Sequence, residues 1–221
     1  MVIQLYRSIK KMKNKTTKIM ILVLSTALFG CAQNAKEKEL QTFINNHVEK
    51  VKPLSKEANL AYWDAAISGK EEDYDKVSEL TLEIRQIYSN AKDFAMLKEM
   101  KESCDVKDTI LARQLDILYN GFLENQIEPE LLKEIVELST DIEKNFSTFR
   151  GTIDGEKVTD NEIKEILKTE TDSAKREKAW LASKQVGPVV ADDLIKLVKL
   201  RNKAAQKLGY ENFHTLSLTT A

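Results

Sequence analysis

Histidine is the side chain that most often transfers a proton near neutral pH or binds a catalytic metal, and this 221-residue chain has two, His47 and His214. A zinc site carried by one helix needs two histidines four positions apart, so that both imidazoles lie on one face. The two histidines are far apart in the sequence, so this zinc pair is absent. We expect His47 to be a hydrogen-bonded core residue of a helix, and His214 to have a local capping or packing role.

Other catalytic motifs are also absent from the sequence, which has neither a glycine-rich phosphate loop nor a Gly-x-Ser-x-Gly motif. Its 35 Asp and Glu residues are mixed with 34 Lys and Arg residues, as on exposed helix faces, so no catalytic carboxylate pair can be chosen. The net charge of -1 forms no basic stripe, and nucleic acid is therefore not an expected partner. Trp63 and Trp180 lie near apolar stripes, and we expect both to pack in the core rather than stack on a ligand.

The first of two cysteines follows a sequence that is typical of an export signal. Five lysines precede the apolar run IMILVLSTALFG, which is shorter than the roughly 20 residues of a membrane-spanning helix. The run ends in LFGC, residues 28–31, which resembles a bacterial lipobox, although Phe29 is bulkier than the residue usual at its place. We predict a signal peptide over residues 1–30, with Met12 as an alternative start, and a lipid anchor on Cys31.

An ordinary export signal, or a short hydrophobic anchor with an incidental cysteine, is the alternative to a lipoprotein. Several acyl chains would hold the protein stably at a membrane, because each buried CH₂ contributes about 0.8 kcal/mol. We therefore expect a protein of the bacterial cell envelope, facing the periplasm or the cell surface, with residues 31–39 as a lipidated tether. Cys104 would have no disulfide partner, and we expect a buried or incidental thiol rather than a nucleophile.

The remaining segment, residues 40–221, must position any functional group on helices. The whole chain has 42% hydrophobic and 31% charged residues but only seven glycines and three prolines, which favours an all-α fold of long helices. Apolar residues recur at steps of three and four over residues 40–65 and again over 74–95, which predicts an antiparallel helix pair. Pro53 should kink or split the first helix, and Ser68-Gly69 should end it. No internal repeat divides the segment, so we expect one domain.

Local signals predict the boundaries of the later elements. Asp105 is expected to open a helix that runs to Phe122, and Pro129 to lie in the first turn of a helix that runs to Phe146. Asp154-Gly155 is expected to form the turn of one short β-hairpin.

Thr159 and Glu162 have the spacing of a capping box. Asp172 is expected to cap a helix that ends at Gly187-Pro188, and the last long helix should end before Gly209.

The segment Thr171–Leu218 resembles the corresponding stretch of the angiotensin-converting-enzyme-like peptidyl-dipeptidases, and it is similar, as a second choice, to the thimet oligopeptidase and oligopeptidase F families. Residues 57–80 resemble the first lid helices of the first family, and residues 149–167 its hairpin and following helix. The resemblance covers the chain from about residue 40 to its end. The matching residues of the last segment are Arg176, Trp180, Gly187, Leu200, Arg201, Asn202, Ala204, Ala205, Leu208, Gly209 and Tyr210.

The resemblance implies a two-lobed helical fold around a deep channel for short peptides, of which residues 40–221 would be an incomplete half. It also implies zinc, bound by a His-Glu-x-x-His helix and a downstream Glu, with the Glu of the motif as general base. These residues follow the matched segment in the family, so no catalytic or metal-binding residue can be assigned here. The apolar last residues, FHTLSLTTA, indicate that the chain continues in a longer gene product.

Two functions are therefore open. The first is the N-terminal portion of a lipid-anchored zinc metallopeptidase that hydrolyses short peptides in the bacterial envelope, and this portion alone should be inactive. The alternative is a non-enzymatic helical lipoprotein that acts as a binding or scaffold module.

Overall fold

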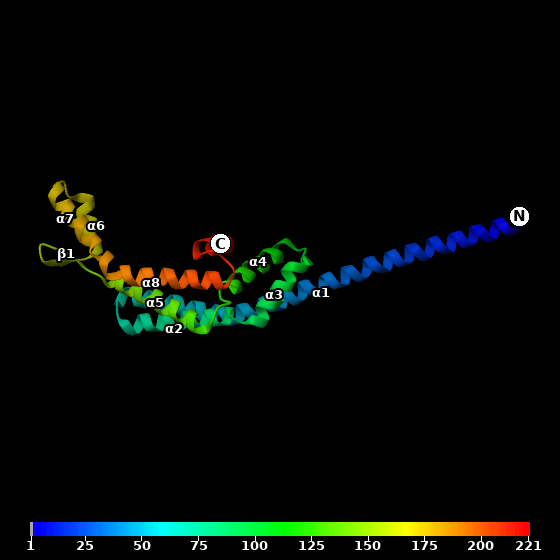
Figure 1. The fold of residues 1–221 in the computed structure, drawn as a ribbon, viewed down its shortest axis with the longest axis horizontal. Helices are drawn as coiled ribbons and strands as arrows, with labels where there is room; N and C mark the ends of the chain where they lie inside the picture. Colours follow the sequence, from blue (N-terminus) through cyan, green and yellow to red (C-terminus); the bar gives the residue numbers. More distant parts are fainter. Residues whose placement is uncertain (1) are drawn as a thin grey trace. The chain divides into compact units, whose positions relative to one another are not determined.

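Helices dominate the computed structural model, which describes the backbone of residues 2–221 and the side chains of residues 35–221 (Figure 1). Among the described residues, a single antiparallel hairpin, β1 (Gly151–Ile153) and β2 (Glu156–Val158), follows α5. The predicted all-α class is confirmed, whereas the larger two-lobed arrangement and the domain boundaries stay predictions. The helices are α1 (Val2–Ser68), α2 (Glu71–Tyr88), α3 (Ala91–Ser103), α4 (Thr109–Leu123), α5 (Pro129–Thr148), α6 (Asp160–Thr169), α7 (Ser173–Lys184), α8 (Val186–Lys207) and α9 (Phe213–Thr220).

The first of two compact units comprises Met1–Val48 and Ala95–Tyr119. Lys36 Nζ lies 3.0 Å from the Glu99 carboxylate, which links α1 to α3, and Lys101 Nζ lies 2.5 Å from the Asp116 carboxylate on α4. These pairs lie on the surface, so burial of apolar side chains provides most of the stabilisation. Among the side chains of this unit that the structure describes, the buried apolar ones are Leu40, Ile44, Leu97, Met100 and Leu115.

The second unit comprises Glu49–Phe94 and Asn120–Ala221. Here α5 contacts α2 on one side and α8 on the other, as Figure 1 shows. The steps of three and four between its apolar positions turn one face of α5 into the core, and the buried residues of α8 meet that face. The cluster consists of Ile127, Leu131, Leu132, Ile135, Leu197 and Ala204.

A smaller cluster holds the hairpin against α6 and α7 within the second unit. Ile163 of α6 packs with Ala179 and Ala182 of α7, and Ile153 and Val158 of the hairpin pack against them. The predicted hairpin turn is confirmed, because Asp154 and Gly155 both adopt positive φ angles, 52° and 89°. The strands pair in the register Gly151↔Val158, Thr152↔Lys157 and Ile153↔Glu156.

The start of α6 carries the predicted capping box, which is confirmed. The Thr159 hydroxyl accepts a hydrogen bond from the Glu162 backbone N–H at 3.2 Å, and the Glu162 carboxylate accepts one from the Thr159 N–H at 2.6 Å. Hydrogen bonds from the Thr159 backbone, and next from its hydroxyl, lower the pKa of Glu162. Two donors of the helix N-terminus are thus satisfied by neighbouring side chains.

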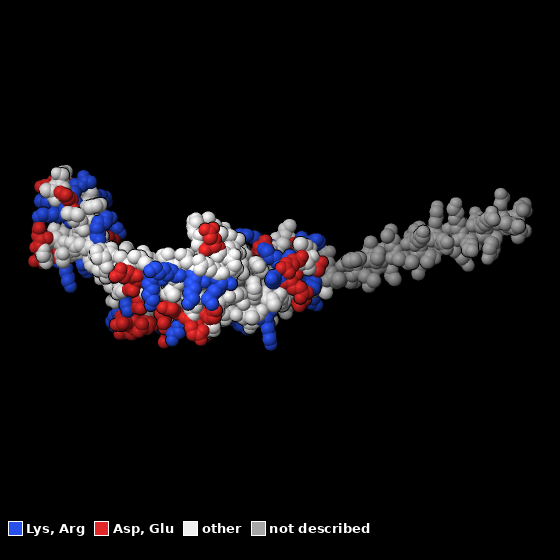
Figure 2. Space-filling view, viewed as in Figure 1, with Lys and Arg blue, Asp and Glu red and all other residues white. Residues whose placement is uncertain are grey.

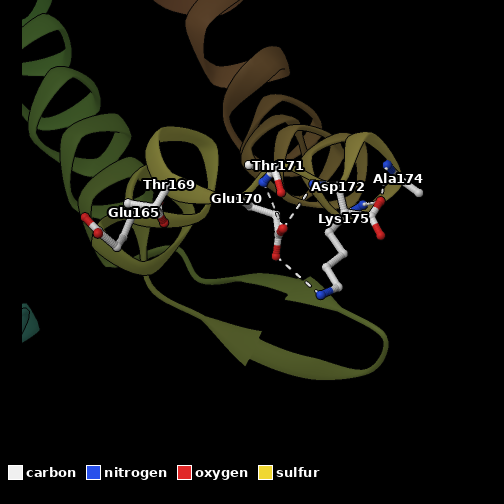
Figure 3. Close-up of polar contacts among 7 residues, drawn as sticks. All are labelled: Glu165, Thr169, Glu170, Thr171, Asp172, Ala174 and Lys175. Atoms are coloured by element: carbon white, nitrogen blue, oxygen red, sulfur yellow. Dashed lines mark hydrogen bonds and ion pairs between the residues drawn. The ribbon is translucent and has the colours of Figure 1, made fainter.

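The turn between α6 and α7 is held by two carboxylates, as Figure 3 shows. Glu170 Oε1 accepts hydrogen bonds from the backbone N–H groups of Thr171 and Asp172 at 2.9 and 3.0 Å. Asp172 Oδ1 in turn accepts from the backbone N–H of Ala174 at 2.9 Å, which confirms the predicted cap of α7. The N–H of Asp172, the side chain of Lys175 and the N–H of Thr171 together lower the pKa of Glu170.

Three predicted helix boundaries are wrong. The pattern over residues 74–95 is divided between α2 and α3, because Asn90 Oδ1 accepts from the backbone N–H groups of Lys92 and Asp93 and so starts a new helix. The next helix is capped by Asp108 rather than Asp105. In both cases a side-chain acceptor that the prediction did not name satisfies the first free N–H groups.

The third wrong boundary is at Gly187-Pro188, which lies in the first turn of α8 instead of ending α7. Pro is tolerated there because the first N–H groups of a helix have no partner within the helix. Pro53 lies inside α1, which is not split at this residue. The predicted helix ends at Gly69 and Gly209 are confirmed, and both glycines have positive φ angles, 66° and 87°.

Candidate functional site

The two histidines do not belong to a metal site among the residues that the structure describes. His47 is 6% exposed and stacks on Phe43 with 5.8 Å between ring centroids. This location matches the prediction of a core residue. His214 lies on the exposed surface of α9. Among the described side chains no group of three His, Cys, Asp or Glu residues could hold a metal ion, so these residues do not fit a zinc ion.

The predicted core positions of both tryptophans are wrong. Trp63 is 66% exposed and Trp180 is 52% exposed. Each side chain is thus largely outside the core of its unit, and Lys184 Nζ lies 5.3 Å from the centroid of the Trp180 ring. The spacing of apolar residues shows which side of a helix is apolar, but not which part of that side a neighbouring helix covers. Both tryptophans lie on a part that no described neighbouring helix covers.

The two cysteines have different outcomes. Cys104 is exposed, with a φ angle of 54°, so the buried alternative of its prediction is wrong, while an incidental thiol stays a prediction. It lies in the loop after α3, where a Cβ-bearing residue in the left-handed region ends the helix. Cys31, like the predicted signal peptide over residues 1–30, lies outside the residues whose side chains the structure describes. No described helix is both long and apolar enough to cross a bilayer.

The most distinctive polar feature of the second unit is a cleft that α2, α5 and α8 line together. It consists of two cavities of about 380 and 220 Å³, and Arg85, Ser139 and Arg201 line both of them. The three residues therefore belong to the wall that the two cavities share, and we call this group of three the arginine junction. The larger cavity is also lined by Ala58, Asn59, Tyr62, Val77, Thr81, Val136, Thr140 and Glu143. The smaller one is also lined by Glu124, Ile127, Ile135, Ala204, Phe213 and Leu216.

Arg85 is held by a buried amide. Its Nε donates to Asn125 Oδ1 at 2.7 Å, and Asn125, which is 7% exposed, donates through Nδ2 to the Gly121 carbonyl at 2.8 Å. This chain of bonds fixes the plane of the guanidinium. Burial lowers the pKa of Arg85, the Glu124 carboxylate opposes this effect, and the positive charge of Arg201 adds to it. The two arginines are therefore close enough to repel each other.

Arg201 is held by a hydroxyl and an aromatic ring. Its Nη2 donates to Ser139 Oγ at 3.4 Å, and its guanidinium carbon lies 5.2 Å from the centroid of the Phe213 ring. Phe213 is itself placed by its backbone N–H, which donates to Asn202 Oδ1 at 2.9 Å. Burial lowers the pKa of Arg201 as well. Both guanidinium groups remain charged, because arginine keeps its proton in proteins.

The two glutamates of the cleft are bound to hydroxyl groups. Glu143 accepts a hydrogen bond from the Tyr62 hydroxyl at 2.6 Å, and this bond raises the pKa of Tyr62. Glu124 accepts one from the Thr220 hydroxyl. Within the described residues neither Arg85 nor Arg201 forms an ion pair with a carboxylate (the ion pairs there are made by lysines). Among these residues the junction thus carries two positive charges without a direct counter-ion.

Figure 2 shows acidic side chains gathered next to a row of basic ones on the surface of this unit. A hollow between α2 and α5 is lined by five acidic residues, Glu71, Asp75, Glu79, Glu137 and Asp141. Exposed lysines follow α8 at steps of three and four, at residues 196, 199, 203 and 207. Two of them pair with Glu134 and Glu128 of the neighbouring segment. These charges are solvated and partly paired, unlike those of the arginine junction.

The sequence interpretation missed the arginine junction. It named Arg201 only as one of the residues that match the family, and it did not name Arg85. A signal was present: Arg201 lies four residues after Leu197 and three before Ala204, both of which are buried. An arginine on the buried stripe of a helix, in a chain whose other helix faces carry lysines, indicates a guanidinium that is partly removed from water.

Comparison with known protein families gives a match that covers most of the chain. The model of the peptidase family M2, described as angiotensin-converting enzyme, matches residues 34–219. The match includes every residue of the arginine junction and begins three residues after Cys31.

Proposed function

Because the chain belongs to the angiotensin-converting enzyme family of peptidases, we propose that it is the N-terminal helical portion of a lipid-anchored zinc metallopeptidase that hydrolyses short peptides in the bacterial envelope. The observation that carries the proposal is the family match over residues 34–219. A function related to metallopeptidases follows from membership in the family. The lipid anchor, the location in the envelope and the assignment of this chain to the N-terminal portion of the enzyme are proposals.

Zinc is the cofactor of this family, but the residues of this chain do not fit it. The sequence has no His-Glu-x-x-His motif, and the described side chains offer no group of three metal ligands. We therefore assign zinc binding and the catalytic base to residues outside these 221. What this chain can supply is a wall of the peptide-binding channel, made by helices whose positions are set by the core of the second unit.

The anchor rests on the sequence around Cys31. The basic region, the short apolar run and the LFGC tetrapeptide precede the matched segment without overlapping it. A lipidated tether over residues 31–39 would leave the helical portion in water next to the membrane. Replacement of Cys31 by Ser should then move the protein from the membrane fraction to the soluble fraction and abolish its labelling by radioactive palmitate. If C31S stayed in the membrane fraction and were still labelled by palmitate, the proposed lipid anchor would be contradicted.

The peptidase proposal is tested on the protein as it occurs in the cell. It should be purified from detergent-solubilised envelopes with an antibody against the exposed residues of α7, and its mass, its zinc content and its hydrolysis of short peptides should be measured. We expect a mass well above the 25.2 kDa of this chain, about one zinc ion per molecule, and hydrolysis that a chelator abolishes and zinc restores. A protein of no more than the 25.2 kDa of this chain, without zinc and without hydrolysis, would refute the proposal and favour a helical binding module.

A further inference from the structure

The C-terminal part of α8 is basic and has no acidic residue. Its sequence, LIKLVKLRNKAAQK over residues 194–207, contains five lysine and arginine residues and neither aspartate nor glutamate. In the whole chain, by contrast, 34 basic residues are mixed with 35 acidic ones. A helix that combines a basic composition with an exposed apolar face is typical of segments that lie on a membrane surface. The side chains that the core leaves uncovered decide what this segment can bind.

Three apolar side chains of this segment are exposed, and we call them the apolar stripe of α8. Leu194, Ile195 and Val198 are 47, 54 and 50% exposed, whereas Leu197 is buried in the cluster that α8 forms with α5. At about 100° per residue, Ile195 lies about 160° around the helix from Leu197. The stripe is therefore on a side of α8 that α5 does not cover. Single exposed apolar residues are common, but a contiguous group marks a binding surface.

The lysine row of α8, at residues 196, 199, 203 and 207, borders the apolar stripe. Lys199 lies four residues after Ile195, and Lys203 follows one turn later. Both lysines are exposed, and among the described residues neither forms an ion pair with a carboxylate, unlike the other two lysines of the row. In Figure 2 the basic row lies between the acidic group and an uncharged surface. Lys199 and Lys203 thus carry positive charge without a direct counter-ion in the described part of the chain.

The acidic residues near the row lie on its other side. Glu128, Glu130 and Glu134 line a hollow together with Lys203 and Lys207, and they belong to α5 or directly precede it. Because α5 packs against the buried side of α8, these carboxylates and the apolar stripe are separated by the lysine row. A negatively charged surface that approaches the stripe therefore meets the lysines before it meets the carboxylates.

A lipid bilayer with anionic head groups complements this arrangement. A lysine can keep its ammonium group among lipid phosphates while its aliphatic stem lies along apolar neighbours. Phospholipid phosphates supply the missing negative charge, and they attract basic segments that lie close to the surface. A contact of this size is weak by itself, but a lipid anchor would hold the protein at a high effective concentration next to the bilayer.

We propose that the exposed face of α8 docks on an anionic phospholipid surface. Leu194, Ile195 and Val198 enter the boundary between head groups and acyl chains, and Lys199 and Lys203 bind lipid phosphates. The inference rests on the proposed function, since the lipid anchor brings the protein to the bilayer. It adds a second, reversible contact that orients the second unit at the membrane.

The first test places a photo-crosslinker in the apolar stripe. The full-length protein is purified from envelopes of cells that incorporate p-benzoyl-phenylalanine in place of Ile195, and it is reconstituted into vesicles of phosphatidylcholine with or without an equal part of phosphatidylglycerol. After irradiation, mass spectrometry identifies the molecule that position 195 has joined. We expect phospholipid adducts, with a yield at least about fivefold higher in the anionic vesicles. No lipid adduct, adducts only to another part of the protein, or equal yields in both vesicles would overturn the proposal.

Variants then test the lysines without the anchor. The C31S form of the full-length protein is mixed with anionic vesicles, and binding is measured by sedimentation. Lys199→Gln/Lys203→Gln should weaken binding at least about tenfold, because two cations that face lipid phosphates are lost.

Lys52→Gln/Lys56→Gln is the matched control. These two lysines of α1 are also exposed and four residues apart, and they form no ion pair among the described residues. The control should bind vesicles as C31S does, and an equal loss would point to total charge and overturn the assignment to α8. Circular dichroism checks that each variant is folded, and the crosslinks at position 195 decide the question if a variant does not fold.

The outcomes separate this inference from the proposed function. If C31S leaves the membrane fraction but position 195 joins no lipid, the anchor is kept and the α8 contact is refuted. If the crosslinks and their dependence on the lysines are found in a protein that palmitate does not label, the contact is kept and the anchor is refuted. Zinc content and peptide hydrolysis test the peptidase separately.

Discussion

A methyl group added at Gly151 should destabilise the second unit. Gly151 is buried at the start of β1, and a Cβ built on it would lie 2.7 Å from the backbone carbonyl oxygen of Ala182 and 3.3 Å from the Ala182 Cβ. Contacts of Cβ atoms stay above 3.0 Å, and the obstacle is backbone rather than a flexible side chain. The strand or α7 must therefore shift.

Movement of Ala182 disturbs the small cluster that it forms with Ile163 and Ala179. Overpacking of a well-packed core costs about 1–3 kcal/mol, and we expect Gly151→Ala to lower the free energy of unfolding by this amount. Gly187→Ala is the matched control, because a Cβ at Gly187 meets no atom within 4 Å apart from its chain neighbours and the backbone of its own helix. Gly187 lies in the first turn of α8, where the helical gain of alanine is offset by the restriction that Pro188 places on the residue before it, so the change should stay within about 1 kcal/mol.

The assay is urea unfolding of the purified chain, followed by tryptophan fluorescence in a Trp63→Phe background. Trp180 of α7 is then the reporter, and it lies on the helix that the new methyl group would displace. Gly151→Ala should lower the urea midpoint with an unchanged m value, and Gly187→Ala should change the midpoint less than Gly151→Ala does. Equal midpoints for the two variants would show that β1 and α7 are not in close contact at Gly151.

Further substitutions test the core, a helix cap and the support of the arginine junction. Leu132→Ala removes one of the largest fully buried side chains and should cost about 2–5 kcal/mol in urea unfolding, so a loss below about 1 kcal/mol would contradict its central position. Thr159→Ala should cost about 1 kcal/mol in urea unfolding. The pKa of Glu162 is lowered from 4.5 in the folded protein, so the cap contributes fully above pH 4.5 and its contribution is lost as the pH falls through the folded-state pKa. The cost of the substitution should therefore shrink at acid pH, and a cost that does not change with pH would refute this link. Asn125→Ala removes the acceptor of Arg85 Nε and should cost about 1–3 kcal/mol in urea unfolding, because the guanidinium loses its buried partner; an unchanged urea midpoint would show that this bond does not stabilise the unit.

Local features of this fold could be predicted from short stretches of sequence. The capping box of Thr159 and Glu162, the cap at Asp172 and the turn at Asp154-Gly155 all occur at the predicted positions. Each depends on hydrogen bonds or backbone angles within about four residues, so the sequence contains the whole interaction. The same holds for the glycine that ends α1, because a positive φ angle is a property of one residue.

Boundaries with several candidate caps were less predictable. Asn90 starts α3, although the apolar pattern of the sequence continues across this residue. Asp108 starts α4, although Asp105 was the predicted start of that helix. Several polar residues in a row offer alternative acceptors of nearly equal strength, and packing of the flanking helices selects one of them.

The family could be identified from the order of residues along the chain, and so could the all-α class, since long helices need only apolar residues at steps of three and four. The tertiary structure alone decided which side of each stripe is covered, and it left Trp63 and Trp180 exposed. It also brought Arg85 and Arg201, from helices α2 and α8, to one cleft. Contacts between residues so far apart in the chain depend on how helices pack, and packing depends on the shapes of many side chains together, which no local pattern contains.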